Sequence, residues 1–237
     1  MNKAAIRQEV WDELEARGVA RFPFPPHGRI PNFDGADRAA DRLAATDAWA
    51  AAGTIKSNPD SPQRPVRRRA LEAGKIVYMA VPRLRDPMPF LRLDPDTIDD
   101  IDRATTIDGS AEYGTPVDPE SVEPIDGIVA GSVAVTPDGD RIGKGEGYSD
   151  LEYAILREFG SVSDETRTMT TVHELQLVTA DVETDSHDVP IEIVAMPDRL
   201  ARTEEISPKP VGIEWNAISA EQVEEIPILS RLRDRPD

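Results

Sequence analysis

A glycine-rich segment in the middle of the chain, Arg141-Ile-Gly-Lys-Gly-Glu-Gly-Tyr-Ser-Asp150, constrains the fold most strongly. The apolar residues 125–135 before it are typical of a strand. The run from Leu151 to Phe159 after it is typical of a helix that Gly160 ends. Glycine lets the backbone approach a ligand closely and adopt positive φ. The segment therefore predicts a strand, a glycine loop and a helix, an arrangement whose loop N–H groups and helix N-terminus favour a bound anion.

The loop differs from the two commonest phosphate-binding motifs. From Gly139 to Gly143-Lys144 it is one residue short of a P-loop and lacks the hydroxyl that should follow the lysine. Its three glycines alternate as G-x-G-x-G, whereas a dinucleotide fingerprint needs G-x-G-x-x-G. A glycine-rich connection without a ligand remains an alternative. Arg141 and Lys144 add positive charge and favour an anion, and Asp150 at the helix start could hold a metal.

Charge and composition exclude several classes of function. The 237 residues carry a net charge of −18, whereas a general nucleic-acid surface is basic. The chain has no cysteine, which excludes disulfides, thiolate metal sites and cysteine nucleophiles. No apolar run approaches the ~18 residues of a membrane span, and the N-terminus resembles no signal segment. We therefore expect one cytoplasmic domain over residues 1–237, a monomer that binds neither nucleic acid nor membranes. The acid-rich, lysine-poor composition suits a halophilic-like protein or an ordinary acidic one.

The N-terminus predicts a helix over residues 2–16 that carries two cations at its start. Lys3, Arg7, Val10 and Leu14 follow one another at helical spacing, so they share a face. Val10 and Leu14 are suited to packing on the body. Lys3 and Arg7 would then lie over a ligand, although two solvated charges are an alternative reading.

The remaining pattern predicts an α/β protein with helices on both faces of a sheet. Residues 34–52 are expected to form an alanine-rich helix that Asp34 would cap, and the apolar run 76–81 is typical of a strand covered on both faces. Residues 94–104 resemble a helix, residues 105–122 a loop, residues 170–178 a strand and residues 210–215 a closing strand. Because strands alternate with helical segments, a layered α/β architecture is favoured. His173, Gln176 and His187 have irregular spacing, which favours hydrogen bonding over a metal site.

The glycine segment resembles the ATP-binding loop of the 5-formyltetrahydrofolate cyclo-ligase family, whose usual form is R-[LI]-G-x-G-x-G-Y-Y-D. Arg141, the glycines, Tyr148 and Asp150 fall in register, and Ser149 departs from the second tyrosine. The resemblance spans most of the chain. It is closest to the branch called methenyltetrahydrofolate synthetase domain-containing proteins, in which the segments RIPNFDGA, NPDSPQ, GKGEGYSDLEYA, HDVPIEIV and PVGIEW are familiar.

This resemblance implies a three-layer α/β/α fold with a mixed, mostly parallel sheet, of the phosphosugar-isomerase and CoA-transferase type. It implies an enzyme that uses ATP and Mg²⁺ to cyclise a small folate, 5-formyltetrahydrofolate, to 5,10-methenyltetrahydrofolate, with release of ADP and phosphate. The site residues that it implies are the phosphate-binding cations Lys3, Arg7, Arg141 and Lys144, the loop residues Gly143, Gly145, Glu146, Gly147 and Tyr148, and Asp150 as metal ligand. Arg141 and Tyr148 would be catalytic. Glu146 would repel phosphate unless it points away.

Asp60 falls, counted back from Gly74-Lys75, where the resembling family often has a folate-contacting glutamate. A helix cap is an equally good reading of this residue. Two other functions stay open at this stage. One is a non-catalytic nucleotide- or folate-binding protein on the same scaffold. The other is a phosphosugar isomerase, although no residue reads as a sugar-phosphate base.

Overall fold

An eight-stranded mixed sheet forms the centre of the computed structural model, which describes residues 2–204 and 206–235. Its strand order is β12-β11-β10-β7-β3-β4-β5-β6. The five strands from β11 to β4 run parallel to their neighbours, while β12, β5 and β6 are antiparallel. The strands are β3 (Thr54–Ser57), β4 (Ile76–Ala80), β5 (Phe90–Leu93), β6 (Thr115–Val117), β7 (Gly127–Val129), β10 (Arg167–Thr171), β11 (Ile193–Ala195) and β12 (Leu200–Arg202).

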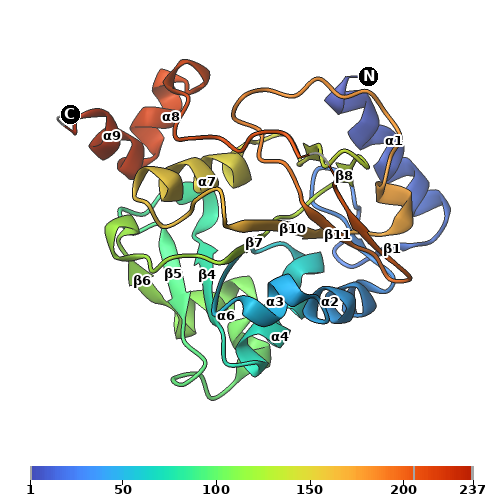
Figure 1. The fold of residues 1–237 in the computed structure, drawn as a ribbon, viewed down its shortest axis with the longest axis horizontal. Coiled ribbons are helices and arrows are strands. Elements are labelled where there is room, and N and C mark those ends of the chain that lie inside the picture. The colour runs from blue at the N-terminus through green and yellow to red at the C-terminus, as the bar shows by residue number, and fades with distance from the viewer. Residues whose placement is uncertain (1, 205, 236–237) are drawn as a thin grey trace.

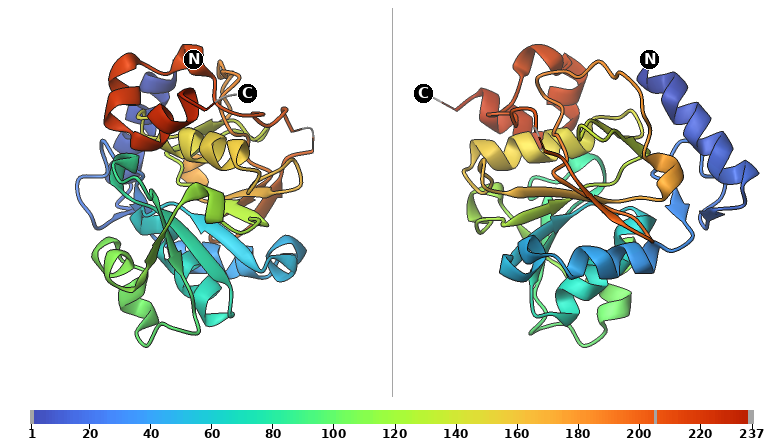
Figure 2. Two further views of the ribbon diagram at one scale, coloured as in Figure 1. Left: turned by 90° about the vertical axis from the view of Figure 1, so that its left-hand side faces the viewer. Right: turned by 45° about the vertical axis from the view of Figure 1, so that its right-hand side comes forward.

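Helices cover both faces of this sheet, which confirms the predicted α/β fold (Figures 1 and 2). One face carries α2 (Ala36–Ala44), α3 (Asp47–Ala51), α4 (Arg64–Glu72), α5 (Ile101–Ala104) and α6 (Ile107–Tyr113). The other carries α7 (Tyr148–Glu158), with α8 (Ala220–Glu225) and α9 (Pro227–Arg233) beside it. Short 3-10 turns, η1 (Ser61–Gln63), η2 (Pro82–Leu84), η3 (Pro119–Ser121), η4 (Glu174–Gln176) and η5 (Trp215–Ala217), join these elements.

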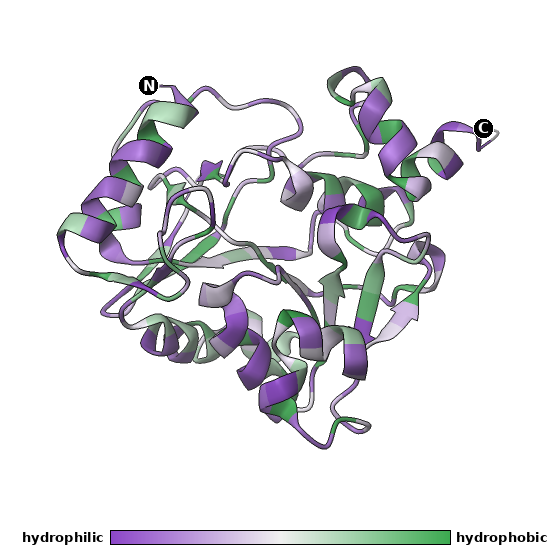
Figure 3. Cartoon of the chain, turned by 180° about the vertical axis from the view of Figure 1, so that it is seen from behind, coloured by the Kyte–Doolittle hydropathy of each residue, from purple (hydrophilic) through white to green (hydrophobic). Residues whose placement is uncertain are grey.

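The strand β4 contributes side chains to two hydrophobic cores, one on each face of the sheet. Its side chains alternate in direction, as in any strand. Tyr78 and Ala80 pack into the core under α7, whereas Val77 and Met79 pack into the core under α2 and α4. Both sets are buried, so the continuous apolar run in the sequence follows from cover on both faces. Figure 3 shows the same division, with apolar strands inside and polar surfaces on the surrounding helices.

The helix α1 (Lys3–Ala16) packs outside the main layers, against the hairpin of β8 (Ala134–Val135) and β9 (Arg141–Ile142). Asn2 caps it by accepting a hydrogen bond from the Ala4 N–H at 2.8 Å, as its sequence predicts. Val10 and Leu14 are buried against β8 and β9. A second short hairpin, β1 (Ala20–Arg21) with β2 (Asn32–Phe33), follows α1. This packing holds the N-terminal cations beside the glycine loop, which follows β9.

Several predicted elements were wrong in extent. The helix expected over 34–52 is two helices, because Thr46 caps a new one by accepting from the Trp49 N–H, and Gly35 rather than Asp34 precedes the first. The loop expected over 105–122 contains α6, which Thr106 caps in the same way. Of the helix expected over 94–104, only α5 forms. The strand expected over 170–178 ends at Thr171, and the described residues 210–215 form no strand.

Within the described part of the chain, no helix has both the length and the apolar character needed to cross a membrane.

Candidate active site

A cavity of about 870 Å³ opens where the parallel strands β3, β4 and β7 end. Asn58 follows β3, Val81 follows β4 and Gly131 lies just beyond β7, and all three line the cavity. Ligands of open α/β sheets bind at the carboxyl ends of the strands. The volume suits a small-molecule ligand.

The glycine loop forms one wall of this cavity. Gly147 precedes α7 in the left-handed conformation, with φ of 72°, and Gly145 has φ of 106°. A side chain at Gly145 would also crowd Arg7, because its Cβ would lie 3.3 Å from Arg7 Cζ. Arg7 in turn donates from Nε to the Gly143 carbonyl at 2.7 Å. The loop therefore needs glycine both for its backbone and for the close approach of α1.

A buried ion pair stands behind the loop. Arg141 donates from Nη2 to Asp150 Oδ2 at 2.5 Å and from Nη1 to the Gly131 carbonyl at 2.9 Å. The second oxygen of Asp150 accepts from the Val189 N–H at 3.1 Å. Burial acts to lower the pKa of Arg141, but the charge and hydrogen bond of Asp150 outweigh it and raise the pKa. Arg141 Nε is buried and has no hydrogen-bond partner among the described residues.

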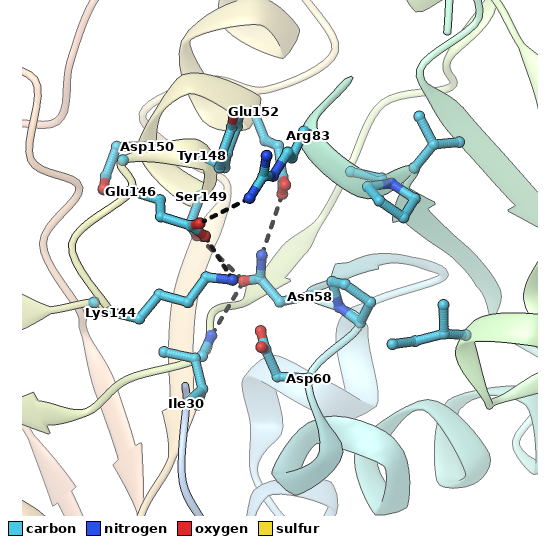
Figure 4. Close-up of a pocket in the computed structure, with 18 of the residues that line it drawn as sticks. Ile30, Asn58, Asp60, Arg83, Lys144, Glu146, Tyr148, Ser149, Asp150 and Glu152 are labelled. Atoms are coloured by element: carbon cyan, nitrogen blue, oxygen red, sulfur yellow. Dashed lines mark hydrogen bonds and ion pairs between the residues drawn. The ribbon is translucent and has the colours of Figure 1, made fainter. Parts of the chain in front are cut away.

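Glu146 lies between two cations at the rim of the cavity (Figure 4). Its Oε2 is 2.6 Å from Lys144 Nζ, and its Oε1 is 3.8 Å from Arg83 Nη2. Arg83 belongs to η2 and has a left-handed backbone, with φ of 57°, which is uncommon for a residue other than glycine. Glu146 is thus already paired with cations, and a phosphate group would compete with it for Lys144.

Acidic residues of the segment 185–188 face the start of α1. Lys3 Nζ is 2.5 Å from Asp188 Oδ2 and 3.6 Å from Asp185 Oδ2. Asp185, His187 and Asp188 each offer one ligand atom, and these atoms lie within 4.8 Å of one another. Carboxylate oxygens are the ligands that Mg²⁺ prefers, whereas imidazole suits transition metals better. The two aspartates therefore have the chemistry that suits a magnesium ion, next to Lys3.

Asp60 lies on the opposite wall from the glycine loop, next to Gly131. It occupies the cap position of η1, but its side chain makes no capping hydrogen bond, which speaks against the helix-cap reading. Burial raises the pKa of this carboxyl group, and the nearby cations Lys144 and Arg67 offset part of the rise. Arg67 is buried beneath it and donates to the main-chain carbonyls of Asn58, Pro59 and Asp60. The sequence signal for Asp60 thus corresponds to a carboxylate held at a cavity wall.

Comparison with known proteins identifies the family. Residues 1–197 match the model of the 5-formyltetrahydrofolate cyclo-ligase family, which is most of the chain. The chain belongs to this cyclo-ligase family. It is 41% identical over 241 residues to a methenyltetrahydrofolate synthase domain-containing protein of Bos taurus and 39% identical over 239 residues to that of Homo sapiens. These alignments cover 100% and 99% of this chain but only 63% and 62% of the relatives, so the chain spans less than two thirds of their length.

The fold of this cyclo-ligase family member resembles a solved structure. The NMR structure of Aquifex aeolicus 5,10-methenyltetrahydrofolate synthetase superposes with a TM-score of 0.52 at 16% sequence identity. The match covers 87% of this chain and 95% of the other. At this identity the likeness supports the shared α/β fold.

All of the site residues predicted from the sequence for this cyclo-ligase family member line the same cavity. They are Lys3, Arg7, Asp60, Arg141, Gly143, Lys144, Gly145, Glu146, Gly147, Tyr148 and Asp150. Their chemical roles stay predictions. For Asp150 the structure adds a second use, because both of its oxygens already accept hydrogen bonds from Arg141 and the Val189 N–H.

Sequence reasoning missed several residues of the cavity wall, namely Asn58, Arg83, Glu152, Asp185 and Asp188. Glu152 carried a detectable signal, because it stands between apolar residues in a helix that is buried on almost every side. A charge in such a helix needs a partner. The partner comes from β3, far away in the sequence, so pattern alone could not name it.

Proposed function

We propose that this chain catalyses the ATP-dependent cyclisation of 5-formyltetrahydrofolate to 5,10-methenyltetrahydrofolate, with release of ADP and phosphate. Family membership supports the reaction class. The observation that carries the proposal is the convergence of Lys3, Arg7, Arg141 and Lys144, with the glycine loop, on a single cavity. Four cations beside a helix N-terminus suit a polyphosphate such as that of a nucleoside triphosphate.

The cavity also has a place for a less polar ligand. The wall formed by β4, β5 and α6 contributes Val81, Met88, Leu91, Ile107 and Ala111. These elements lie at the opposite side of the fold from α1 and β8 (Figure 1). A folate ring system against this wall would meet the triphosphate in the middle of the cavity. Tyr148 begins α7 between the two parts and would contact both ligands.

Positioning and charge stabilisation account for most of a phosphoryl transfer, so no protein nucleophile is needed. The formyl oxygen attacks the γ-phosphorus of ATP, the bond to the β,γ-bridging oxygen breaks, and ADP leaves. The nitrogen N10 then attacks the activated formyl carbon, the carbon–oxygen bond breaks with loss of phosphate, and the N10 proton goes to solvent. Arg141, which lines the cavity and is fixed by Asp150, would lie beside the γ-phosphate. Arg7 and Lys144 would hold the remaining phosphate oxygens.

Asp185 and Asp188 fit a magnesium ion, and the pairing of Asp188 with Lys3 shows that a positive charge is already stable there. When bound, Mg²⁺ would neutralise phosphate charge. We propose that Asp150 acts mainly by orienting Arg141, while these two aspartates bind the ion. Lys3 would then exchange its carboxylate partner for a phosphate oxygen.

The test is a turnover assay with the purified chain, Mg·ATP and 5-formyltetrahydrofolate. We expect methenyltetrahydrofolate absorbance to rise only when ATP is present, with one ADP formed per product. Binding of both ligands without product would instead support a non-catalytic nucleotide- or folate-binding protein. A folded chain that binds neither ligand would contradict both.

A further inference from the structure

A buried charged pair at the wall of the cavity has no role in the mechanism above. Glu152 of α7 forms an ion pair with Lys56 of β3, and the two side chains are 6% and 1% exposed. Replacing such a pair by apolar side chains of similar volume is often neutral or stabilising. Stability alone therefore gives little reason for charges at this position. Glu152 lines the cavity, which places a carboxylate where a ligand can meet it.

The surrounding hydrogen bonds fix the orientation of this carboxylate. Asn58 donates from Nδ2 to Glu152 Oε2 at 3.2 Å, and this is the same oxygen that pairs with Lys56. Asn58 is itself held, because its Oδ1 accepts from the Gly131 N–H at 3.1 Å and the Ser149 hydroxyl at 3.2 Å. Figure 4 shows Asn58 between Glu152 and Ser149. The amide can adopt only the orientation that donates toward Glu152.

One oxygen of Glu152 remains for a ligand. The hydrogen bond from Asn58 and the ion pair with Lys56 both involve Oε2, and no hydrogen bond joins Oε1 to any residue that the structure describes. A carboxylate only accepts hydrogen bonds, so a ligand group that meets Oε1 must be a donor. A hydrogen bond to a charged acceptor is about twice as strong as a neutral one, and stronger where water is excluded. Glu152 thus presents a rigid, charged acceptor toward a ligand N–H.

We propose that Glu152 is a specificity-determining residue that accepts a hydrogen bond at Oε1 from the exocyclic amino group of the pterin ring of a reduced folate. This inference rests on the proposed function. The exocyclic amino group on the pyrimidinone ring is an N–H donor at one edge of the folate, which is what Oε1 requires. Asn58 and Lys56 act on the substrate through Glu152, so they are positioning residues.

The contact between Glu152 and the amino group is tested by combining a modified ligand with a substitution at Glu152. Binding of 5-formyltetrahydrofolate is compared by calorimetry with binding of its analogue in which a methyl group replaces the 2-amino group, both without ATP. For the wild-type chain we expect the analogue to bind roughly 10- to 100-fold more weakly, the loss of one hydrogen bond to a charged group. Glu152→Gln keeps the shape but directs its NH₂ toward the ligand, because Asn58 must still donate to its oxygen. The variant should lose the discrimination.

A second variant keeps the experiment interpretable if Glu152→Gln fails to fold. Glu152→Gln alone leaves Lys56 buried without a counter-charge, whereas Lys56→Met with Glu152→Gln removes both charges at similar volume. Glu158→Gln is the matched control, because Glu158 lies on the same helix but accepts from the Ile213 N–H outside the cavity. The double variant should discriminate less than about 3-fold between the two ligands, since its charged acceptor is gone. Its thermal shift with Mg·ATP should be unchanged, and the control should behave as wild type.

Four results would overturn the proposal. If the folded double variant still distinguished the two ligands fully, a group other than Glu152 would bind the amino group. Loss of Mg·ATP binding instead of folate discrimination would place Glu152 in the nucleotide site. A wild-type chain that turns over 5-formyltetrahydrofolate yet binds both ligands equally would refute this contact and leave the proposed function standing. Absence of any folate binding would refute both the contact at Glu152 and the proposed function.

Discussion

The stability of the variant Asp150→Asn distinguishes two roles of this carboxylate, the orientation of Arg141 and the binding of a metal ion. Asp150 and Arg141 have side chains that are only 10% and 5% exposed, so neither charge is well solvated. Asn keeps the size of Asp but removes the charge that balances Arg141. Removing one partner of a buried ion pair costs about 3–5 kcal/mol. In a domain of this size each kcal/mol shifts the melting temperature by roughly 2–4 °C, so we expect a fall of about 6–20 °C.

The assay is reversible urea unfolding of the wild-type chain, Asp150→Asn and the double variant Arg141→Met with Asp150→Leu. The double variant should lie close to wild type, because it removes both charges together. If Asp150 only orients Arg141, the residual activity of Asp150→Asn should need the same Mg²⁺ concentration as wild type. An Asp150→Asn protein as stable as wild type, with a raised Mg²⁺ requirement, would refute this reasoning and return Asp150 to the role of a metal ligand.

Three further changes test the other parts of the cavity. Burial raises the folded-state pKa of Asp60 above 3.8, so its ionised form costs stability above the raised value and the cost disappears as pH falls toward 3.8. Asp60→Asn should therefore raise the melting temperature at neutral pH, with a gain that shrinks on acidification, while turnover falls; a pH-independent change would contradict the assignment. Arg7→Met should raise the KM for ATP about 10- to 100-fold in steady-state kinetics, the loss of charged hydrogen bonds, whereas Arg17→Met, in the exposed pair with Glu13, should change nothing. Asp188→Asn should increase the Mg²⁺ concentration needed for half-maximal activity, and an unchanged requirement would exclude this residue from the metal site.

Local signals in the sequence predicted the parts of the fold that depend on neighbouring residues. The cap at Asn2, the continuous apolar run of β4 and the glycine loop before α7 all act over a few positions, and the structure contains them. The signals that divide these segments into separate elements are also local, but they are weaker. Thr46 and Thr106 cap new helices inside segments that composition had assigned as one helix and one loop.

Contacts between distant segments explain what the sequence could not predict. Glu152 appears as an isolated charge in an apolar run, whereas Lys56 stands among polar residues, and only the packing of α7 on β3 makes them partners. The commitment of Asp150 to Arg141 was hidden for a related reason, because a carboxylate in the first turn of a helix is also suited to the helix dipole or to a metal. The contact with Arg141 is buried, and burial depends on the tertiary fold, so the sequence could not reveal it.

Transfer of the formyl oxygen to phosphate is the most direct test of the proposed reaction. The chain is supplied with Mg·ATP and 5-formyltetrahydrofolate whose formyl oxygen is replaced by oxygen-18, and the released phosphate is analysed by mass spectrometry. If the formyl oxygen attacks the γ-phosphate, each phosphate released with methenyltetrahydrofolate should carry one heavy oxygen from the substrate. Release of unlabelled phosphate would show that water attacks ATP, and it would contradict the proposed mechanism.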